Sequence, residues 1–135
     1  ISESADSGVR VGWNSNADIV ACEISNNGQG IRRRGGLLVS TSSSATLSSS
    51  ELFGNGTGVI VTRQSFVDRR DGTVVSENVS DGLRLTYDSG VVGNDPIPPN
   101  GSGYGVYCND TESSFRNRSS EPVVTNCKGF DLPLP

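Results

Sequence analysis

The densest group of side chains that could exchange protons is a run of four charged residues, Asp68, Arg69, Arg70 and Asp71. Acids and bases within reach of one another can transfer a proton to or from a bound molecule. The run precedes the apolar residue Val74, so we expect it in a surface turn, where two ion pairs explain it as readily as catalysis does. It is the only candidate for a catalytic site that the sequence offers, and the catalytic residues stay unknown.

Other reactive side chains are few. The chain has no histidine, which removes histidine bases, histidine metal ligands and the Ser-His-Asp arrangement. No metal site is predicted, and any metal would need oxygen ligands; Ca²⁺ stays open as an alternative, although the aspartate spacing of a calcium loop is missing. The cysteines Cys22, Cys108 and Cys127 form no Cys-x-x-Cys pair. A disulfide between Cys108 and Cys127 is expected in a secreted protein, and the role of Cys22 stays open.

Asn-x-Ser/Thr triplets are a third chemical feature, because they accept N-linked glycans in secreted proteins. They begin at Asn55, Asn78, Asn100, Asn109 and Asn117, and chance explains some of them. The last three lie in stretches with loop composition, so they are the expected glycan acceptors. The triplets favour a secreted or cell-surface protein.

A repeat along the chain indicates which elements carry these residues. Glycine followed by an apolar residue recurs at intervals of 22, 28, 24, 23 and 24 residues, at Gly8, Gly30, Gly58, Gly82, Gly105 and Gly129. An asparagine that follows an apolar residue by three positions precedes most of these glycines, and the set is Asn27, Asn55, Asn78, Asn94 and Asn126. Alternating apolar residues after each glycine, such as Val59 and Val61, are typical of a short strand with one buried face.

The repeat predicts an all-β fold. Three short strands in each repeat of about 24 residues make one coil of a solenoid, and no amphipathic helix is visible. We expect residues 1–135 to form one solenoid domain of about five coils. The alternative is an antiparallel β-sandwich, which also has short alternating strands but does not predict the shared spacing of asparagine and glycine.

The pattern apolar-x-x-Asn-x-x-x-Gly-apolar resembles the coils of right-handed parallel β-helix proteins, the pectin-lyase-like group, over roughly residues 8–130. The resemblance implies that inward Val, Ile and Leu stack in files and that the asparagines stack at a turn and bond neighbouring backbone. It also implies that acidic residues and a basic residue would act in an enzyme that cleaves or epimerises a uronate, and Asp68–Asp71 is then the place for them.

Outward positions on the strands that follow the glycines form a row. The residue two after each glycine is Arg10, Arg32, Ile60, Arg84 or Tyr107, and Arg34, Arg63 and Tyr87 fall just beyond this row. Arginine holds carboxylates and sulfates in a forked geometry, so Arg10, Arg32, Arg84 and Tyr107 are the candidate ligand-binding residues for an acidic polysaccharide. The alternative is that neighbouring glutamates or loop aspartates neutralise the arginines.

Charge limits the partners. The net charge is −4, so a nucleic-acid partner is not expected, and no apolar run is long enough to span a membrane. The chain does not begin with Met, and we expect it to be a part of a larger surface or filament-forming protein that contacts carbohydrate or copies of itself. Its predicted function is an extracellular structural or adhesive module, with a polysaccharide lyase or epimerase as the alternative.

Overall fold

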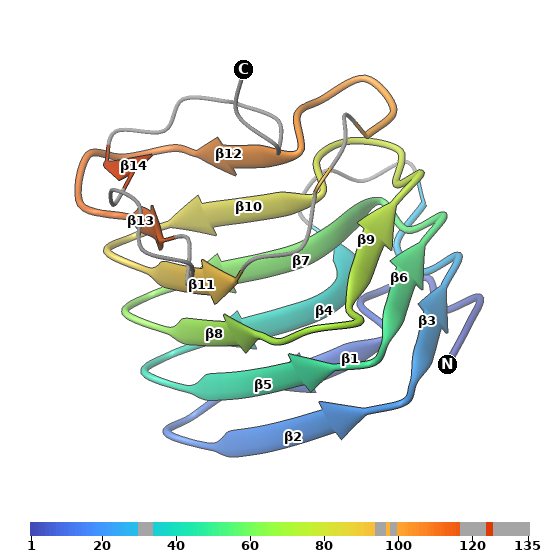
Figure 1. Cartoon of the computed structure of the whole chain (residues 1–135), viewed down its shortest axis with the longest axis horizontal. Helices are drawn as coiled ribbons and strands as arrows, with labels where there is room; N and C mark the ends of the chain where they lie inside the picture. Colours follow the sequence, from blue (N-terminus) through green and yellow to red (C-terminus); the bar gives the residue numbers. More distant parts are fainter. Residues whose placement is uncertain (30–33, 94–96, 98–99, 117–123, 126–135) are drawn as a thin grey trace.

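The computed structural model describes residues 1–29, 34–93, 97, 100–116 and 124–125, and they form a parallel β-solenoid of about four turns (Figure 1). The all-β solenoid predicted from the repeat is therefore confirmed, with about four turns in place of about five coils. The prediction of an antiparallel sandwich is wrong, because strands of successive turns pair in parallel in all three sheets as far as β13.

Three sheets line the solenoid, and each of the first three turns contributes one strand to every sheet. The first sheet has the order β1 (Val9–Val11), β4 (Gly35–Ser40), β7 (Thr57–Thr62), β10 (Leu83–Thr86) and β12 (Val106–Cys108). The second sheet has β2 (Asn16–Val20), β5 (Ser44–Ser48), β8 (Phe66–Arg69), β11 (Gly90–Gly93), β13 (Ser114–Arg116) and β14 (Val124–Thr125). The third sheet has β3 (Glu23–Ser25), β6 (Glu51–Phe53) and β9 (Val74–Ser76).

One strand breaks the parallel rule. β14 pairs antiparallel with β13, whereas every other strand pair between named strands is parallel in the part of the chain that the structure describes. The antiparallel strand lies where the next parallel strand of the second sheet would lie. The parallel stack of that sheet therefore ends at β13.

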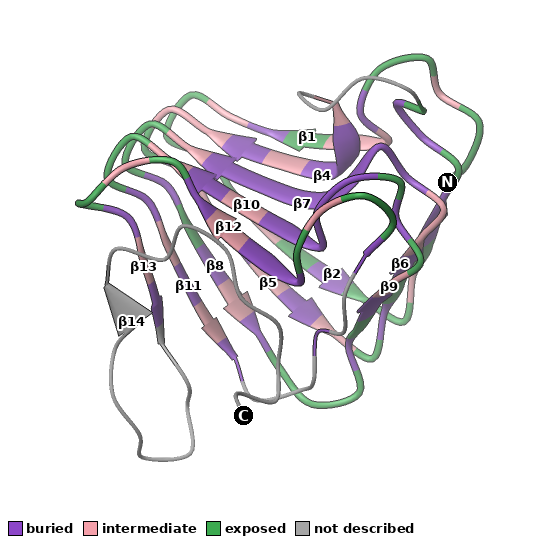
Figure 2. Cartoon of the chain, turned by 90° about the horizontal axis from the view of Figure 1, so that it is seen from above, coloured by how far each residue is buried: buried purple, intermediate pink, exposed green. Residues whose placement is uncertain are grey.

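Inward side chains form files along the solenoid axis, as the alternation predicts. In the first sheet Val59 pairs with Leu83 and Leu83 with Val106, while Val61 pairs with Leu85 and Leu85 with Cys108. These residues are buried, and buried residues of the other two sheets meet them in a single core (Figure 2). Stacking alike side chains in this way gives each turn the same apolar interior.

A ladder of four asparagines runs through the turn between the third and first sheets. The Oδ1 atom of Asn55 accepts the backbone N–H of Asn27 at 3.0 Å and the Asn27 side-chain amide at 3.0 Å. In the same way Asn78 Oδ1 accepts the backbone and side-chain N–H groups of Asn55, and Asn100 Oδ1 accepts those of Asn78, at 2.9 to 3.1 Å. All four side chains are fully buried, so the ladder satisfies amide groups that water cannot reach.

The last rung of this ladder corrects two predictions. We expected Asn94 in the ladder and a glycan on Asn100, but Asn100 is the ladder residue, and a buried amide in these bonds cannot carry a glycan. The apolar residue that precedes this rung by three is Ile97, whereas Val91 belongs to β11 of the second sheet. Asn109 is exposed and stays a predicted glycan acceptor, while Asn94, Asn117 and Asn126 lie outside the described residues.

The repeated glycines make room for the ladder. A Cβ atom added to Gly8, Gly36, Gly58 or Gly82 would lie 2.6 to 2.9 Å from the side-chain nitrogen of the nearest ladder asparagine. Gly36 therefore holds the place predicted for Gly30, because the chain takes extra residues between Asn27 and β4. Gly105 precedes β12 as expected, while Gly30 and Gly129 lie outside the described residues.

A second ladder, of serines, was not predicted. The Oγ atoms of Ser43, Ser65, Ser89 and Ser113 each accept the backbone N–H of the serine one turn earlier, at 3.0 to 3.4 Å. It lies between the first and second sheets, and these four serines are buried. Two corners of the coil are therefore closed by short polar side chains that bond the neighbouring backbone.

Gly58→Ala is expected to destabilise the protein by about 2 kcal/mol or more, because the new methyl group would lie 2.6 Å from the Gly82 carbonyl oxygen and 2.9 Å from the Asn78 amide nitrogen. Gly12→Ala is the matched control, since its nearest neighbour is a side-chain oxygen at 3.3 Å. Urea unfolding followed by circular dichroism measures both. Equal stability of the two variants would contradict the role given to the glycines.

Candidate functional site

The outer face of the first sheet carries two rows of side chains. The outer row is Arg10, Leu38, Ile60, Arg84 and Tyr107, paired strand by strand. Arg32 was predicted in this row, but Leu38 takes its place and Arg32 lies outside the described residues. The second row, near the carboxyl ends of the strands, is Ser40, Thr62, Thr86 and Asn109.

A groove of about 440 Å³ lies over these rows and crosses the strands. It is lined by Arg10, Leu38, Ser40, Ile60, Thr62, Arg63, Arg84, Thr86, Tyr87 and Asn109. It reaches from β1 to the end of β12, which is four strand spacings or roughly 19 Å. A ligand in this groove would extend along the solenoid axis.

The floor and wall of the groove differ in polarity. Leu38 and Ile60 lie side by side in the outer row and give an apolar floor. Beside them the hydroxyl of Thr86 donates to Thr62 Oγ1 at 2.8 Å, which aligns the two hydroxyls along the wall. A groove with one apolar and one hydroxyl-bearing side suits a ligand that has both kinds of surface.

Arg84 is held by its neighbours. Its Nε and Nη2 atoms both donate to Asp81 Oδ2, at 3.0 and 2.8 Å, and the Asp81 side chain is only 4% exposed. The guanidinium carbon lies 4.8 Å from the ring centroid of Tyr107, and the Tyr104 ring stacks on Tyr107 with centroids 6.4 Å apart. This end of the face is therefore a preorganised aromatic and cationic surface.

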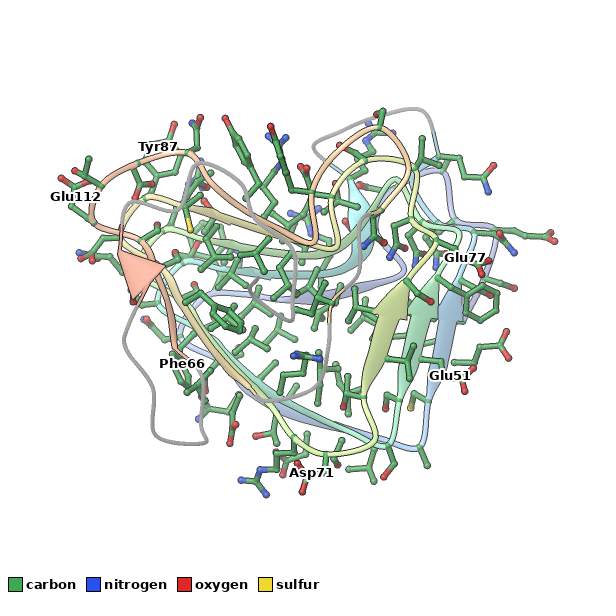
Figure 3. The ribbon with its side chains drawn as sticks, turned by 45° about the horizontal axis from the view of Figure 1, so that its top comes forward. Glu51, Phe66, Asp71, Glu77, Tyr87 and Glu112 are labelled. Carbon is green, nitrogen blue, oxygen red and sulfur yellow. The ribbon has the colours of Figure 1, made fainter. Side chains whose placement is uncertain are left out.

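The corner between the first and second sheets positions Arg63 and Tyr87. The first four turns pass it with two successive residues at positive φ, namely Trp13 and Asn14, Thr41 and Ser42, Arg63 and Gln64, and Tyr87 and Asp88. Backbone hydrogen bonds join these corners, for example from Gln64 N to the Tyr87 oxygen at 2.9 Å. Figure 3 shows Tyr87 projecting at this corner, and its side chain is 70% exposed.

A second hollow of about 640 Å³ adjoins the groove at this corner. It shares Arg63, Thr86, Tyr87 and Asn109 with the groove and adds Gln64, Asp88, Asp110 and Glu112. Three carboxylates therefore border the groove on the side of the corner. Figure 3 shows Glu112 near Tyr87, far from Glu51 and Glu77 beside the third sheet.

Asp110 stabilises the corner. Burial acts to raise the pKa of Asp110, but hydrogen bonds from Ser113, from the Tyr87 backbone and from the Glu112 backbone outweigh it and hold the pKa below its usual value. The Ser113 N–H donates to Asp110 Oδ1 at 2.6 Å, and the Tyr87 N–H donates to Oδ2. The carboxylate thus fixes the backbone of the residue that borders both hollows.

The charged run Asp68–Asp71 does not form one site. Asp68 and Arg69 belong to β8 and not to the predicted turn, and Arg69 is fully buried, with Nη1 donating to the Thr73 oxygen at 3.3 Å. Asp68 points outward from the second sheet and pairs with Arg70 at 3.1 Å, and Asp71 lies in the turn that follows. Arg69 faces inward because it takes the slot of Leu47 in the preceding turn.

The structure tests part of the cysteine prediction. Cys108 is 2% exposed in the slot above Leu85, as predicted, while Cys127 lies outside the described residues and the disulfide stays a prediction. Cys22 is a free thiol whose Sγ lies 3.3 Å from the Val20 oxygen. Within the residues that the structure describes, no three His, Cys, Asp or Glu side chains are grouped to hold a metal ion, and no helix could cross a membrane.

Sequence reasoning found Arg10, Arg84 and Tyr107 on this face and placed Arg63 and Tyr87 just beyond them. It missed Ser40, Thr62, Thr86 and Asn109, although each lies four residues after its glycine, a spacing that marks the second row.

Comparisons with protein-family models, with curated proteins and with solved structures give no significant match. The parallel solenoid is therefore established by its strand pairing, and a pectin-lyase-like membership is not shown.

Asp110→Ala is expected to lower the free energy of unfolding at pH 7 by about 1 kcal/mol, through loss of the hydrogen bonds from Ser113 and Tyr87. Because folding lowers the pKa of Asp110, its contribution is complete above about pH 4 and is lost as the pH falls through the folded-state value. The difference from the parent protein should therefore shrink at lower pH. Urea unfolding of both proteins at several pH values measures this difference in free energy, with Asp18→Ala on β2 as the control variant. A difference between Asp110→Ala and the parent that does not change with pH would contradict the prediction.

Proposed function

We propose that this chain is a non-catalytic β-solenoid module that binds an extended carbohydrate chain along the outer face of the first sheet. The observation that carries the proposal is the groove that crosses the turns, with Leu38 and Ile60 as its floor and Thr62 and Thr86 along its wall. A pyranose ring has an apolar face of C–H groups and a rim of hydroxyls, so it matches both surfaces.

The periodicity of the groove supports a polymeric ligand. Each turn presents an outer-row residue and a second-row residue about 4.8 Å from those of the next turn, which is comparable to the length of one sugar unit. Arg63 and Asn109 offer donors at the same side, and the exposed Tyr87 ring offers a surface for stacking. A chain of about four sugars would match the length of roughly 19 Å.

A binding role is favoured over a lyase or epimerase by the placement of acids and bases. The Asp68–Asp71 run is split between the interior and the outside of β8. Near the groove, the Asp110 carboxylate is occupied by backbone N–H groups. This arrangement favours recognition of a carbohydrate without its cleavage.

An extracellular setting belongs to the same proposal. Asn109 begins an Asn-x-Thr triplet and is exposed, and a Cys108–Cys127 disulfide would close the last turn in an oxidising compartment. A glycan on Asn109 would lie in the groove, because that residue lines it. Binding experiments therefore need protein made without N-glycosylation.

A structural or adhesive role through copies of this chain is also part of the proposal, with one restriction. The antiparallel β14 lies where a parallel strand from a second copy would add to the second sheet. Head-to-tail stacking at that end would have to displace β14. Adhesion through the carbohydrate groove needs no such change.

Tyr87→Ala is expected to weaken binding of a neutral or mildly acidic tetrasaccharide about tenfold, since stacking on an exposed aromatic ring is lost. Phe66→Ala is the matched control, because Phe66 is an exposed aromatic residue on the second sheet. Titration calorimetry of both variants, after circular dichroism has confirmed their fold, is the test. If no tetrasaccharide from a broad panel binds, or if Phe66→Ala weakens binding as much as Tyr87→Ala, this face is not the binding site.

A further inference from the structure

The charges of the groove residues limit which carbohydrate fits. Arg10 Nη1 lies 3.8 Å from Asp6 Oδ2, a weak contact between exposed side chains, and Asp6 is shared with Arg34, whose Nε lies 3.6 Å from Oδ1. Arg84 has two hydrogen bonds to a single oxygen of Asp81, whose other oxygen accepts the Tyr104 N–H at 3.0 Å. Of the three arginines that line the groove, Arg84 is therefore tightly paired with an aspartate of its own turn, and Arg10 is loosely paired with one.

Arg84 cannot easily be recruited by a ligand. The Asp81 side chain is almost completely buried, so removing its cationic partner would leave a buried carboxylate without its neutralising charge. The cation–π contact with Tyr107 holds the guanidinium further in place. An anionic sugar over Arg84 would have to compete with Asp81, and it gains little.

Arg63 differs from both. It is exposed, and no carboxylate lies within 4.0 Å of its guanidinium in the part of the chain that the structure describes. It lines both the groove and the adjoining hollow, at the corner next to Thr62. Its planar group can form two parallel hydrogen bonds with a carboxylate, and its side chain is not already held by one.

The adjoining hollow has more acids than bases, because Arg63 is the one basic residue among the described residues that line it. Asp88, Asp110 and Glu112 border it, and the whole chain carries a net charge of −4. A ligand with an acid on every sugar would place several carboxylates near these three, and like charges at such distances repel. Arg63 can therefore bind one carboxylate of a ligand, while Asp88, Asp110 and Glu112 would repel further carboxylates nearby.

We infer that, if the groove binds carbohydrate as proposed, its ligand is a sparsely charged glycan, a mainly neutral chain with a single uronate whose carboxylate binds Arg63. The neutral sugars lie over Leu38 and Ile60 and along the hydroxyls of Thr62 and Thr86. This narrows the acidic polysaccharide predicted from the row of arginines, because most of those cations are already paired within the protein.

Three tetrasaccharides of one linkage test this inference by titration calorimetry, one neutral, one with a single internal uronate and one with a uronate at every position. We expect the single-uronate chain to bind about tenfold more tightly than the neutral chain, and the fully acidic chain to bind more weakly than the single-uronate chain. Arg63→Ala should remove the advantage of the single uronate, so that the single-uronate and neutral chains bind the variant with similar affinity, whatever donor the neutral chain loses with the guanidinium. Arg70→Ala, an exposed arginine on the second-sheet side, is the matched control.

The outcomes separate the two proposals. Binding of all three chains with similar affinity, or tightest binding of the fully acidic chain, would overturn the single-uronate inference and leave the carbohydrate groove standing. A tenfold advantage of the single-uronate chain over the neutral chain that persists in Arg63→Ala would likewise overturn it, because the carboxylate would then bind elsewhere. No binding of any chain would overturn the proposed function itself.

Discussion

The buried asparagine ladder is the constraint on which the rest of this solenoid depends. Each rung accepts a backbone N–H and a side-chain N–H from the previous rung, so neither partner can shift by one residue without leaving buried amides unbonded. In a β-strand, such a shift would also exchange the inward and outward faces. The ladder therefore fixes which side chains face the core and which face the groove.

The spacing of the chain reflects this constraint. From the glycine that begins a turn to the asparagine that closes it, the distance is 19 residues for Gly8 to Asn27, 19 for Gly36 to Asn55, 20 for Gly58 to Asn78 and 18 for Gly82 to Asn100. From the asparagine to the next glycine it varies from 3 residues after Asn55 to 9 after Asn27. The largest length changes therefore lie between the ladder and the first sheet, where they leave the stacked strands in register.

This pattern also explains what the sequence could and could not predict. The solenoid, its inward files and three of the ladder asparagines follow from local periodicity, which reports burial directly. The segment after Asn27 gives a false signal, because Gly30 followed by an apolar residue has the same pattern as Gly36, which precedes the inward residue Leu37 of β4. Asn94 imitates Asn100 in the same way, since Val91 and Ile97 both stand three residues before an asparagine. Only contacts between turns distinguish the true member of each pair.

The candidate site was harder to predict for a related reason. Arg10, Arg84 and Tyr107 follow from strand alternation, but their pairing with Asp6 and Asp81 depends on how the loops pack. The sequence does not predict the burial of Arg69, because charged residues rarely face inward. In the structure Arg69 is the last residue of β8, and its side chain occupies the inward position above Leu47. What a site can bind therefore depends on charges that the repeat itself does not reveal.

The most direct test of the account is an NMR titration of the uniformly ¹⁵N-labelled chain with the single-uronate tetrasaccharide, followed residue by residue. The account predicts that the largest shift changes occur at Thr62, Arg63, Thr86 and Tyr87, with the backbone amides of the ladder asparagines protected from exchange throughout. Shift changes centred on β5 and β8 of the second sheet, or rapid exchange of the ladder amides, would contradict it.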